Sequence, residues 1–244
     1  MSLHDVTTEA VLEYDAAACL VGVAEPTDLA PALRARLAGI PRVEGAESVL
    51  ATKPTQVLAL AVVAEHEPGL FRELERRKIG WLAPRLERVA DVAALADEIG
   101  RRVERREAGE EIVQRLAALR PRERASEPIR VFVFDCCGPP FTAGKRAIIT
   151  DLLAHAGAVN VFADTDDDWF NASWEAAIQR KPQLILIDDY GPPDNVAKKR
   201  EALSRIAPLA KLPVVVLPLR DALGTIRSAE VVLQLRAALE RGRS

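Results

Sequence analysis

The sequence predicts an α/β protein of two lobes, each built on a parallel sheet, and three observations lead to this prediction. Short apolar runs of the kind that form buried parallel strands alternate with stretches of helical spacing. A charged helical stretch at residues 91–120 separates two regions that both show this alternation. A segment of the first region also recurs in the second, as expected for duplicated supersecondary units.

The predicted helices and strands follow a βαβ order, which indicates parallel pairing. Capping and breaking residues set their limits: Thr7 or Thr8 can cap the first helix, Pro54 ends the third, and Pro68 lies in the first turn of the fourth. The expected helices are residues 7–17, 29–37, 47–52, 68–78, 144–155, 173–180, 195–206 and 226–239. The expected strands are residues 19–23, 57–63, 79–83, 129–134, 184–187 and 213–217.

The helical stretch is expected to break in the middle. Gly100 and Gly109 each weaken a helix by about 1 kcal/mol relative to Ala, so we expect two helices that meet near residues 104–107. The second would be the long helix that joins the lobes. The predicted domains are an N-terminal α/β lobe at 1–90, a connecting helical spine at 91–121 and a C-terminal α/β lobe at 122–244.

The repeat relates residues 47–60 to residues 175–188. Both copies hold Glu, an aliphatic residue three positions later, Lys-Pro and then an apolar strand. We interpret them as matching units of two Rossmann-like lobes. Ligands of open α/β sheets bind outside the carboxyl ends of the strands, so two facing lobes predict a ligand cleft between them.

The composition excludes several classes of protein. Hydrophobic residues make up 49% of the chain and charged residues 28%, which is enough for a folded core. A net charge of −3 gives no electrostatic case for nucleic acid. No apolar run approaches the roughly 20 residues of a membrane helix. Cys19, Cys136 and Cys137 lack the spacing of a zinc site and are expected to be small core residues.

Two motifs resemble known ligand-binding loops, but each lacks a residue that the loop requires. Residues 138–145 lie where a phosphate loop would be, but the glycine spacing is wrong and Arg146 replaces the Ser or Thr that holds magnesium. Residues 164–175 carry acids at calcium-loop positions, but Trp169 stands where the loop needs Gly. We therefore expect no metal site. Trp169, a large aromatic in a polar loop, indicates either lobe packing or a ligand platform.

Other candidate residues follow predicted strands. The loop at 138–145 would bring Phe141, Thr142 and the N–H groups of a helix N-terminus to the carboxyl edge of a sheet. His4 and His66 follow strand-like segments and could face the cleft, as could Asp188 to Tyr190.

An enzyme would need Asp164 to Asp168 and Asp188 to Asp189 to converge in the cleft with perturbed pKa values. No nucleophile or base partner is visible in the sequence, so we expect no enzyme.

The segment from Phe132 to Pro182 resembles the periplasmic cobalamin-binding proteins of ABC importers. The resemblance rests on PPFTAGK, on GAVNVF, on Trp169 and on the S-x-E of residues 173–175. The N-terminal segments SLHDVTTEAV, LVGVAEPTD and ESVLATKPTQVL extend it over nearly the whole chain. These proteins belong to the class III, helical-backbone superfamily, whose members bind siderophores, haem or cobalamin.

The resemblance implies a solute-binding protein that captures a corrinoid, cobalamin, and delivers it to the transmembrane subunits of an ABC permease. Phe141 and Trp169 match positions that line the corrin cleft, and Asp28 matches a position in an N-lobe loop. Glu175 matches a glutamate that docks on the permease, with Glu67 as its approximate N-lobe counterpart. The full set of candidate ligand-binding residues is His4, Asp5, Asp28, His66, Phe141, Thr142, Trp169, Phe170, Asp189, Tyr190 and Asp221.

The chain departs from this family in the N-terminal lobe, where Pro26 and Leu29 replace aromatic residues and residues 42–47 are too short for an expected tryptophan. Haem or a ferric siderophore is therefore an alternative ligand, with Tyr14 and Tyr190 as the candidate tyrosine ligands for haem. A cytoplasmic corrinoid carrier or sensor is a second alternative. We expect a monomer without other cofactors, periplasmic or at the cell surface with its export signal absent from this sequence. A native start at Met1 would favour the cytoplasm.

Overall fold

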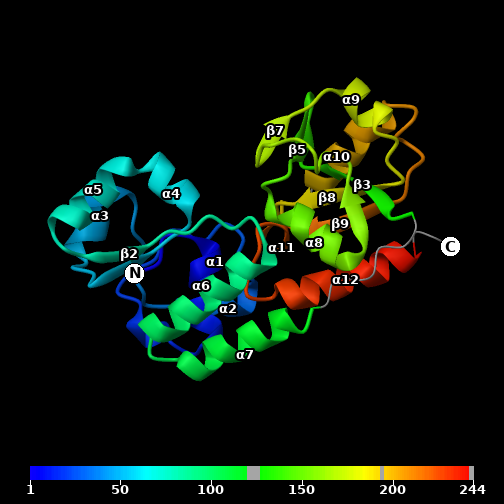
Figure 1. Ribbon diagram of the computed structural model, residues 1–244. Coiled ribbons are helices and arrows are strands. Elements are labelled where there is room, and N and C mark those ends of the chain that lie inside the picture. Colours follow the sequence, from blue (N-terminus) through cyan, green and yellow to red (C-terminus); the bar gives the residue numbers. More distant parts are fainter. Residues whose placement is uncertain (120–126, 193–194, 242–244) are drawn as a thin grey trace. The chain divides into compact units, whose positions relative to one another are not determined.

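The computed structural model describes residues 1–119, 127–192 and 195–241, which divide into two compact units (Figure 1). Unit 1 comprises residues 1–86 and 90–116, and unit 2 comprises 87–89 and the chain from 117 onward. Each unit contains parallel strands and helices. The predicted α/β class with two lobes is confirmed.

Unit 1 has a small parallel sheet of β1 (Gln56–Leu58) and β2 (Gly80–Leu82). Ser2 bridges to Leu58 and to Val23, which widens the sheet without further full strands. Buried apolar side chains, among them Val57 and Leu74, form its core. The helices are α1 (Asp5–Glu13), α2 (Pro31–Ala35), α3 (Gly45–Ala51), α4 (Ala61–His66) and α5 (Pro68–Arg76), with a 3-10 turn at Ala17–Cys19.

Two predicted strands of unit 1 are wrong in extent. The apolar run 57–63 was expected to be one strand, but β1 ends at Leu58 and α4 begins at Ala61. A short apolar run fits a buried helix as well as a buried strand, so periodicity cannot separate the two. The run 19–23 contributes only the bridges of Val23.

The helical stretch consists of α6 (Val89–Arg102) and α7 (Arg106–Ala117), so the predicted break is confirmed. The two helices approach closely where their glycines meet. A Cβ atom on Gly109 would lie 2.9 Å from the Ala96 carbonyl oxygen, and one on Gly100 would lie 3.1 Å from the Gly109 Cα. These glycines therefore allow close packing within unit 1. The role of residues 91–121 as a connecting spine stays a prediction.

Unit 2 is built on a parallel sheet in the order β6-β3-β8-β9. Alternate residues of the central strands, such as Phe132 and Ile185, belong to a core cluster that includes Leu203 of α10. The residues between them, such as Val133 and Leu186, are also fully buried, so both faces of the sheet are covered. The strands are β6 (Ala158–Asn160), β3 (Ile129–Phe134), β8 (Leu184–Asp189) and β9 (Val214–Pro218), and the helices are α8 (Ile148–Ala156), α9 (Trp174–Gln179), α10 (Asn195–Ser204), α11 (Leu219–Ala222) and α12 (Ser228–Arg241).

A second sheet of unit 2 was not predicted. It is antiparallel, in the order β4 (Cys136–Cys137), β5 (Pro140–Ala143) and β7 (Trp169–Asn171). The expected loop at 138–145 contains β5, and the polar, acidic loop expected at 164–175 contains β7. Cys136 is disulfide-bonded and Cys19 is exposed and free, so the expectation of small core cysteines is wrong for both.

The internal repeat is visible in the backbone. Residues 47–60 cover α3 and β1, and residues 175–188 cover α9 and β8, so both copies run from a helix into a parallel strand. The lysine of each Lys-Pro pair is left-handed, with φ 50° at Lys53 and φ 49° at Lys181. A positive φ at a non-glycine residue is uncommon, so its recurrence at matching positions supports duplicated units.

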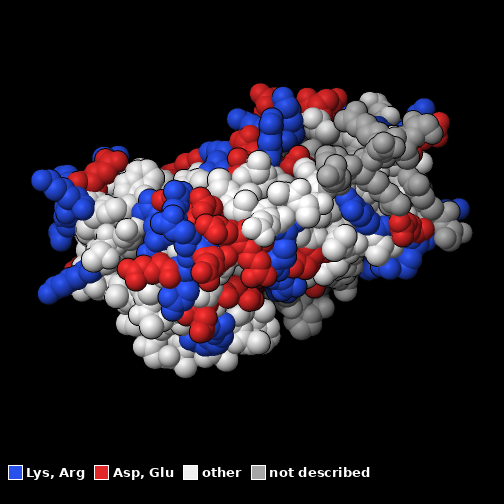
Figure 2. Space-filling model, turned by 60° about the horizontal axis from the view of Figure 1, so that its bottom comes forward, with Lys and Arg blue, Asp and Glu red and all other residues white. Residues whose placement is uncertain are grey.

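Lys and Arg side chains are interspersed with Asp and Glu on the face drawn in Figure 2. The described residues on that face form no continuous basic area of the kind that attracts nucleic acid. Among the described residues, no helix has both the length and the apolar character needed to cross a membrane.

We expect Gly109→Ala to lower the free energy of unfolding by about 1–3 kcal/mol, because its methyl group must displace the Ala96 backbone. Helix propensity alone predicts the opposite sign, a gain of about 1 kcal/mol. The control is Gly69→Ala in α5, where a Cβ atom meets nothing within 4 Å. Urea unfolding measures both variants, and a Gly109→Ala protein as stable as the parent would contradict the packing argument.

Candidate functional site

The side chains of Phe141 and Trp169 form a stacked aromatic pair on the antiparallel sheet of unit 2. Their ring centroids are 6.0 Å apart and the ring planes differ by 22°. In the register of β5 and β7, Phe141 pairs with Asn171 and Ala143 pairs with Trp169. The two rings are therefore diagonal neighbours on one face of the strand pair. Both side chains are partly exposed, which leaves aromatic surface for a ligand.

The other face of the same strand pair points into the core. Thr142 pairs with Phe170; Thr142 is fully buried and its hydroxyl donates to the Val133 carbonyl oxygen at 2.6 Å. Phe170 packs edge-to-face on Phe162, with centroids 5.4 Å apart. Successive side chains of a strand alternate between faces. The prediction that Thr142 contacts a ligand is therefore corrected, and Phe170 is turned away from the aromatic pair.

The N–H groups that follow β5 are already hydrogen-bonded to the acidic loop. Gly144 donates to the Asp168 carbonyl at 2.6 Å and Lys145 donates to the Thr165 carbonyl at 2.8 Å. A Cβ atom on Gly144 would lie 2.5 Å from the Asp167 carbonyl oxygen, so glycine is needed for this approach. The loop expected to offer free N–H groups to a ligand instead anchors residues 165–168.

The acidic loop pairs with arginines. Arg180 donates to Asp164 at 2.6 Å, and this hydrogen bond holds the pKa of Asp164 below its ordinary value. Arg146 lies within 4.0 Å of both Asp166 and Asp167. These carboxylates are therefore partners of arginine side chains on the same unit. The described residues contain no group of three or more His, Cys, Asp or Glu arranged to hold a metal ion.

The three polar residues at the end of β8, Asp188 to Tyr190, lie in different environments. Asp188 is fully buried, which corrects its expected place in an open cleft. Asp189 accepts from the N–H of Gly191 at 2.8 Å and from the amide of Asn195 at 3.2 Å, so it stabilises the local turn. Tyr190 is 40% exposed and remains available to a ligand.

Two buried residues beside Asp188 were missed. Asp135 follows β3 directly, and Lys199 lies on α10 with its ammonium 3.3 Å from an Asp135 carboxylate oxygen. An acid at the end of an apolar strand was a usable signal for Asp135. Lys199 stands in a polar stretch, and no local pattern marks it as buried.

In unit 1, His4 and Asp5 hold the backbone locally. His4 caps α1 by accepting the Val6 N–H at 3.2 Å, and burial lowers its pKa although the nearby Asp5 charge opposes the shift. Asp5 accepts from the N–H groups of Thr27 at 3.0 Å and Asp28 at 2.7 Å. Asp5 therefore fixes the loop that carries Asp28, which is partly exposed.

His66 is exposed at the end of α4. Its Nδ1 lies 2.7 Å from the Val62 carbonyl oxygen. A carbonyl only accepts, so Nδ1 carries a proton and Nε2 is the ring nitrogen left to face a ligand. The next residue, Glu67, is exposed, as is Glu175 in the first turn of α9, and neither forms an ion pair with another described residue.

Asp221 does not join an exposed site. It is buried on α11, and its carboxylate lies 3.8 Å from the Nε of Arg220. The prediction that Asp221 contacts a ligand is corrected, because the side chain faces the interior.

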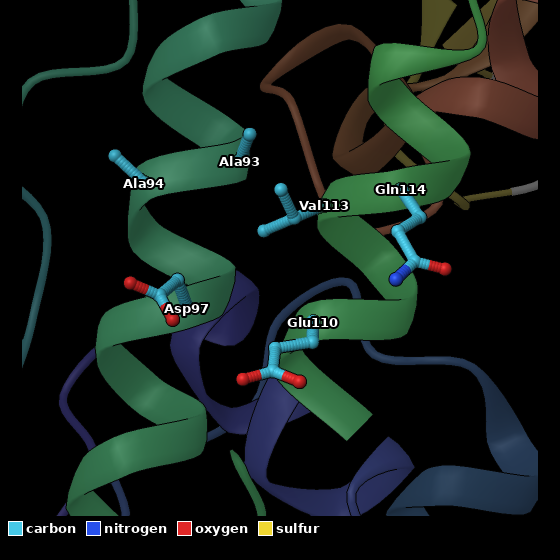
Figure 3. A pocket seen from close by; sticks show the side chains of 6 residues that line it. All are labelled: Ala93, Ala94, Asp97, Glu110, Val113 and Gln114. Atoms are coloured by element: carbon cyan, nitrogen blue, oxygen red, sulfur yellow. The ribbon is translucent and has the colours of Figure 1, made fainter. Parts of the chain in front are cut away.

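A groove of about 330 Å³ lies between α6 and α7 of unit 1. Figure 3 shows Val113 pointing from α7 toward α6, with Asp97 and Glu110 on the two sides. None of the predicted ligand residues lines this groove, so it is separate from the aromatic pair.

Comparisons with known proteins give two kinds of relative. A vitamin B12-binding protein of Salmonella choleraesuis (strain SC-B67) is 31% identical over 144 residues, which cover 58% of this chain and 54% of that protein. The match thus spans about half the length of this relative.

Two solved structures share the fold. The periplasmic heme-binding protein of Roseiflexus sp. RS-1 in apo form has a TM-score of 0.81 and 18% identity, covering 100% of this chain and 98% of its own. The periplasmic vitamin B12 binding protein of Vibrio cholerae has a TM-score of 0.73 and 20% identity, covering 100% and 97%.

The sequence also matches a family as a whole. Residues 45–208 match the family described as periplasmic binding proteins. Proteins of this family bind solutes for transport and are not enzymes, which agrees with the expected absence of catalysis. The resemblance found in the sequence is confirmed, and the chain belongs to the family of periplasmic binding proteins.

Proposed function

We propose that the protein captures a corrinoid, with cobalamin as the specific ligand, and delivers it to the membrane subunits of an ABC transporter. The observation that carries this proposal is the partly exposed pair of stacked rings, Phe141 and Trp169. No covalent chemistry is required, because the protein only has to bind and release the ligand.

The aromatic pair suits the chemistry of a corrinoid. A corrin ring has a broad apolar face surrounded by amide side chains. Burial of an aromatic side chain against such a face contributes about 1.5–3 kcal/mol. Stacked rings held by a strand register lose little further freedom on binding, which favours affinity. The vitamin B12-binding relative supports the corrinoid over other ligands of the same fold.

The two tyrosines favour a corrinoid over a tyrosine-ligated haem. Tyrosine coordinates iron as phenolate, so a raised pKa works against coordination. Burial raises the pKa of Tyr14, whose hydroxyl donates to the Ala96 carbonyl at 3.1 Å. Burial also raises the pKa of Tyr190, and its hydrogen bond to Asp135 raises it further. A corrinoid already carries coordinated cobalt and needs no phenolate from the protein.

Haem is the second candidate, and His66 is the observation that favours it. Its Nδ1–H donates to Val62, which leaves Nε2 oriented as a metal ligand in the manner of histidines at metal sites. Heme-binding structures of the same fold support this alternative. A ferric siderophore remains a further ligand of this fold class, but no described residue favours it.

The delivery step is assigned to Glu67 and Glu175, one exposed carboxylate in each unit. Exposed carboxylates can steer and orient docking on basic residues of a membrane partner. The proposed location is the periplasm, and the protein acts there as a monomer. The remaining corrinoid contacts are assigned to Asp28 and Tyr190, and His66 is assigned to the haem alternative.

We expect Trp169→Ala to weaken cyanocobalamin binding by about tenfold or more, because the ligand loses half of the aromatic pair. Trp169→Phe keeps an aromatic ring and should recover most of the affinity. The control is Leu233→Ala, which truncates an apolar side chain that is 55% exposed on α12. Calorimetric titration gives the dissociation constants, and an unchanged value for Trp169→Ala would remove Trp169 from the site.

A further inference from the structure

Three titratable side chains are buried together at the carboxyl ends of β3 and β8. Asp188 is 0% exposed, Lys199 is 2% exposed and Asp135 is 4% exposed. Charged side chains are rarely buried to this degree unless they are paired. This cluster is not part of the exposed aromatic pair, so its presence needs a separate explanation.

Lys199 contacts three parts of unit 2 at once. Its ammonium lies 3.3 Å from an Asp135 carboxylate oxygen and 2.5 Å from the Asp188 carbonyl oxygen. It also lies 4.4 Å from the centre of the Tyr190 ring, within the range of a cation–π interaction. The Asp135 carboxyl also interacts with the Tyr190 hydroxyl and raises its pKa. Lys199 therefore lies over the face of the Tyr190 ring, and Asp135 acts on the hydroxyl of the same side chain.

The same cluster reaches the strand that carries Phe141. The Asp135 N–H donates to the Phe141 carbonyl oxygen at 3.0 Å. Asp135 also immediately precedes β4, and Cys136 pairs with Phe141 in the antiparallel sheet. The side chain of Asp135 therefore anchors to Lys199 while its backbone anchors the strand of the exposed aromatic pair.

We propose that Lys199 is a positioning residue for ligand binding, which holds the Tyr190 ring and the Phe141 strand in the arrangement that the ligand meets. The proposal rests on the proposed function, because it takes the aromatic face as the ligand surface. Lys199 is buried and contacts no ligand. It acts through Tyr190 and Asp135.

The charges of the cluster fit this role. Lys199 and Asp135 form one buried ion pair, and neither carboxyl oxygen of Asp188 has a hydrogen-bond partner among the described residues. Burial raises the pKa of Asp188, and the Asp135 charge raises it further while Lys199 opposes the shift. Burial without a hydrogen-bond partner therefore disfavours the charged form of Asp188. The neighbouring α11, which packs on β8, adds Arg220 and Asp221 to the charged groups of this region.

The test is a double-mutant cycle in cyanocobalamin affinity. Removing Lys199 alone leaves the Asp135 charge buried without its partner and can unfold the protein. The foldable variant is Lys199→Met combined with Asp135→Asn, which removes both charges. We expect Tyr190→Ala to weaken binding about tenfold in the parent and to have almost no further effect in the combined variant. An equal effect of Tyr190→Ala in both backgrounds, or a combined variant that binds as the parent does, would overturn the proposal.

A second measurement needs no ligand. Tyr14 and Tyr190 are the two tyrosines of the chain, so in a Tyr14→Phe background the tyrosinate absorbance reports Tyr190 alone. We expect Tyr190 to ionise above the ordinary value of about 10, and the combined variant to return it toward that value. No change would overturn the positioning role even if corrinoids bind. If the ionisation of Tyr190 differs between the combined variant and the parent, but the parent binds no corrinoid, the positioning of Tyr190 stands and the corrinoid function is rejected.

Asp188→Asn is expected to behave differently from changes at Asp135 and Lys199. Because the folded-state pKa of Asp188 is raised, its contribution to stability is complete below the unfolded value of about 3.9 and is lost as pH rises toward the folded-state pKa. The Asn side chain does not titrate, so the Asn variant does not lose stability in this way as pH rises. It should therefore bind cyanocobalamin like the parent and be more stable than the parent near neutral pH, with the difference shrinking in acid. Urea unfolding across pH measures this, and an Asn variant less stable at neutral pH would mean that Lys199 is paired with a charged Asp188.

Discussion

The pairing of β5 with β7 is the interaction on which the exposed aromatic surface depends. The register places Thr142 and Phe170 on one face. There the hydrogen bond from the Thr142 hydroxyl to Val133 and the edge-to-face contact of Phe170 with Phe162 fix the strand pair to the core. The same register leaves Phe141 and Trp169 stacked on the other face. A shift by one residue would exchange the two faces, so burial of Thr142 and Phe170 specifies which rings are presented.

The rest of unit 2 supplies a rigid base for this strand pair. The carboxyl ends of β3 and β8 are where ligands of open α/β sheets are expected, and here they carry the buried Lys199–Asp135 ion pair. A buried ion pair contributes little net stability but defines one arrangement, because any other would leave a charge unpaired. The proposed ligand surface is thus positioned by two interactions: the Lys199–Asp135 ion pair and the pairing of β5 with β7.

Much of the fold could be predicted from the sequence, because long apolar runs and proline or glycine punctuation report local structure. The βα order, the break between α6 and α7 and the repeat of residues 47–60 at 175–188 were all predicted. The antiparallel sheet was missed, because its strands are short and lie in segments rich in proline or aspartate. The sign of the Gly109 effect and the burial of Lys199 depend on contacts distant in sequence, which no local pattern contains.

The central claim is that the ligand is a corrinoid bound by aromatic surface rather than a haem bound by iron coordination. Parallel calorimetric titration of the parent and of His66→Ala with cyanocobalamin, cobinamide and haem tests it most directly. We expect heat with both corrinoids. For each corrinoid, the affinities of the parent and of His66→Ala should differ by less than about threefold, well under the tenfold that corresponds to about 1.4 kcal/mol. No heat with either corrinoid, together with haem binding that is lost in His66→Ala, would contradict the corrinoid assignment and leave the family membership unaffected.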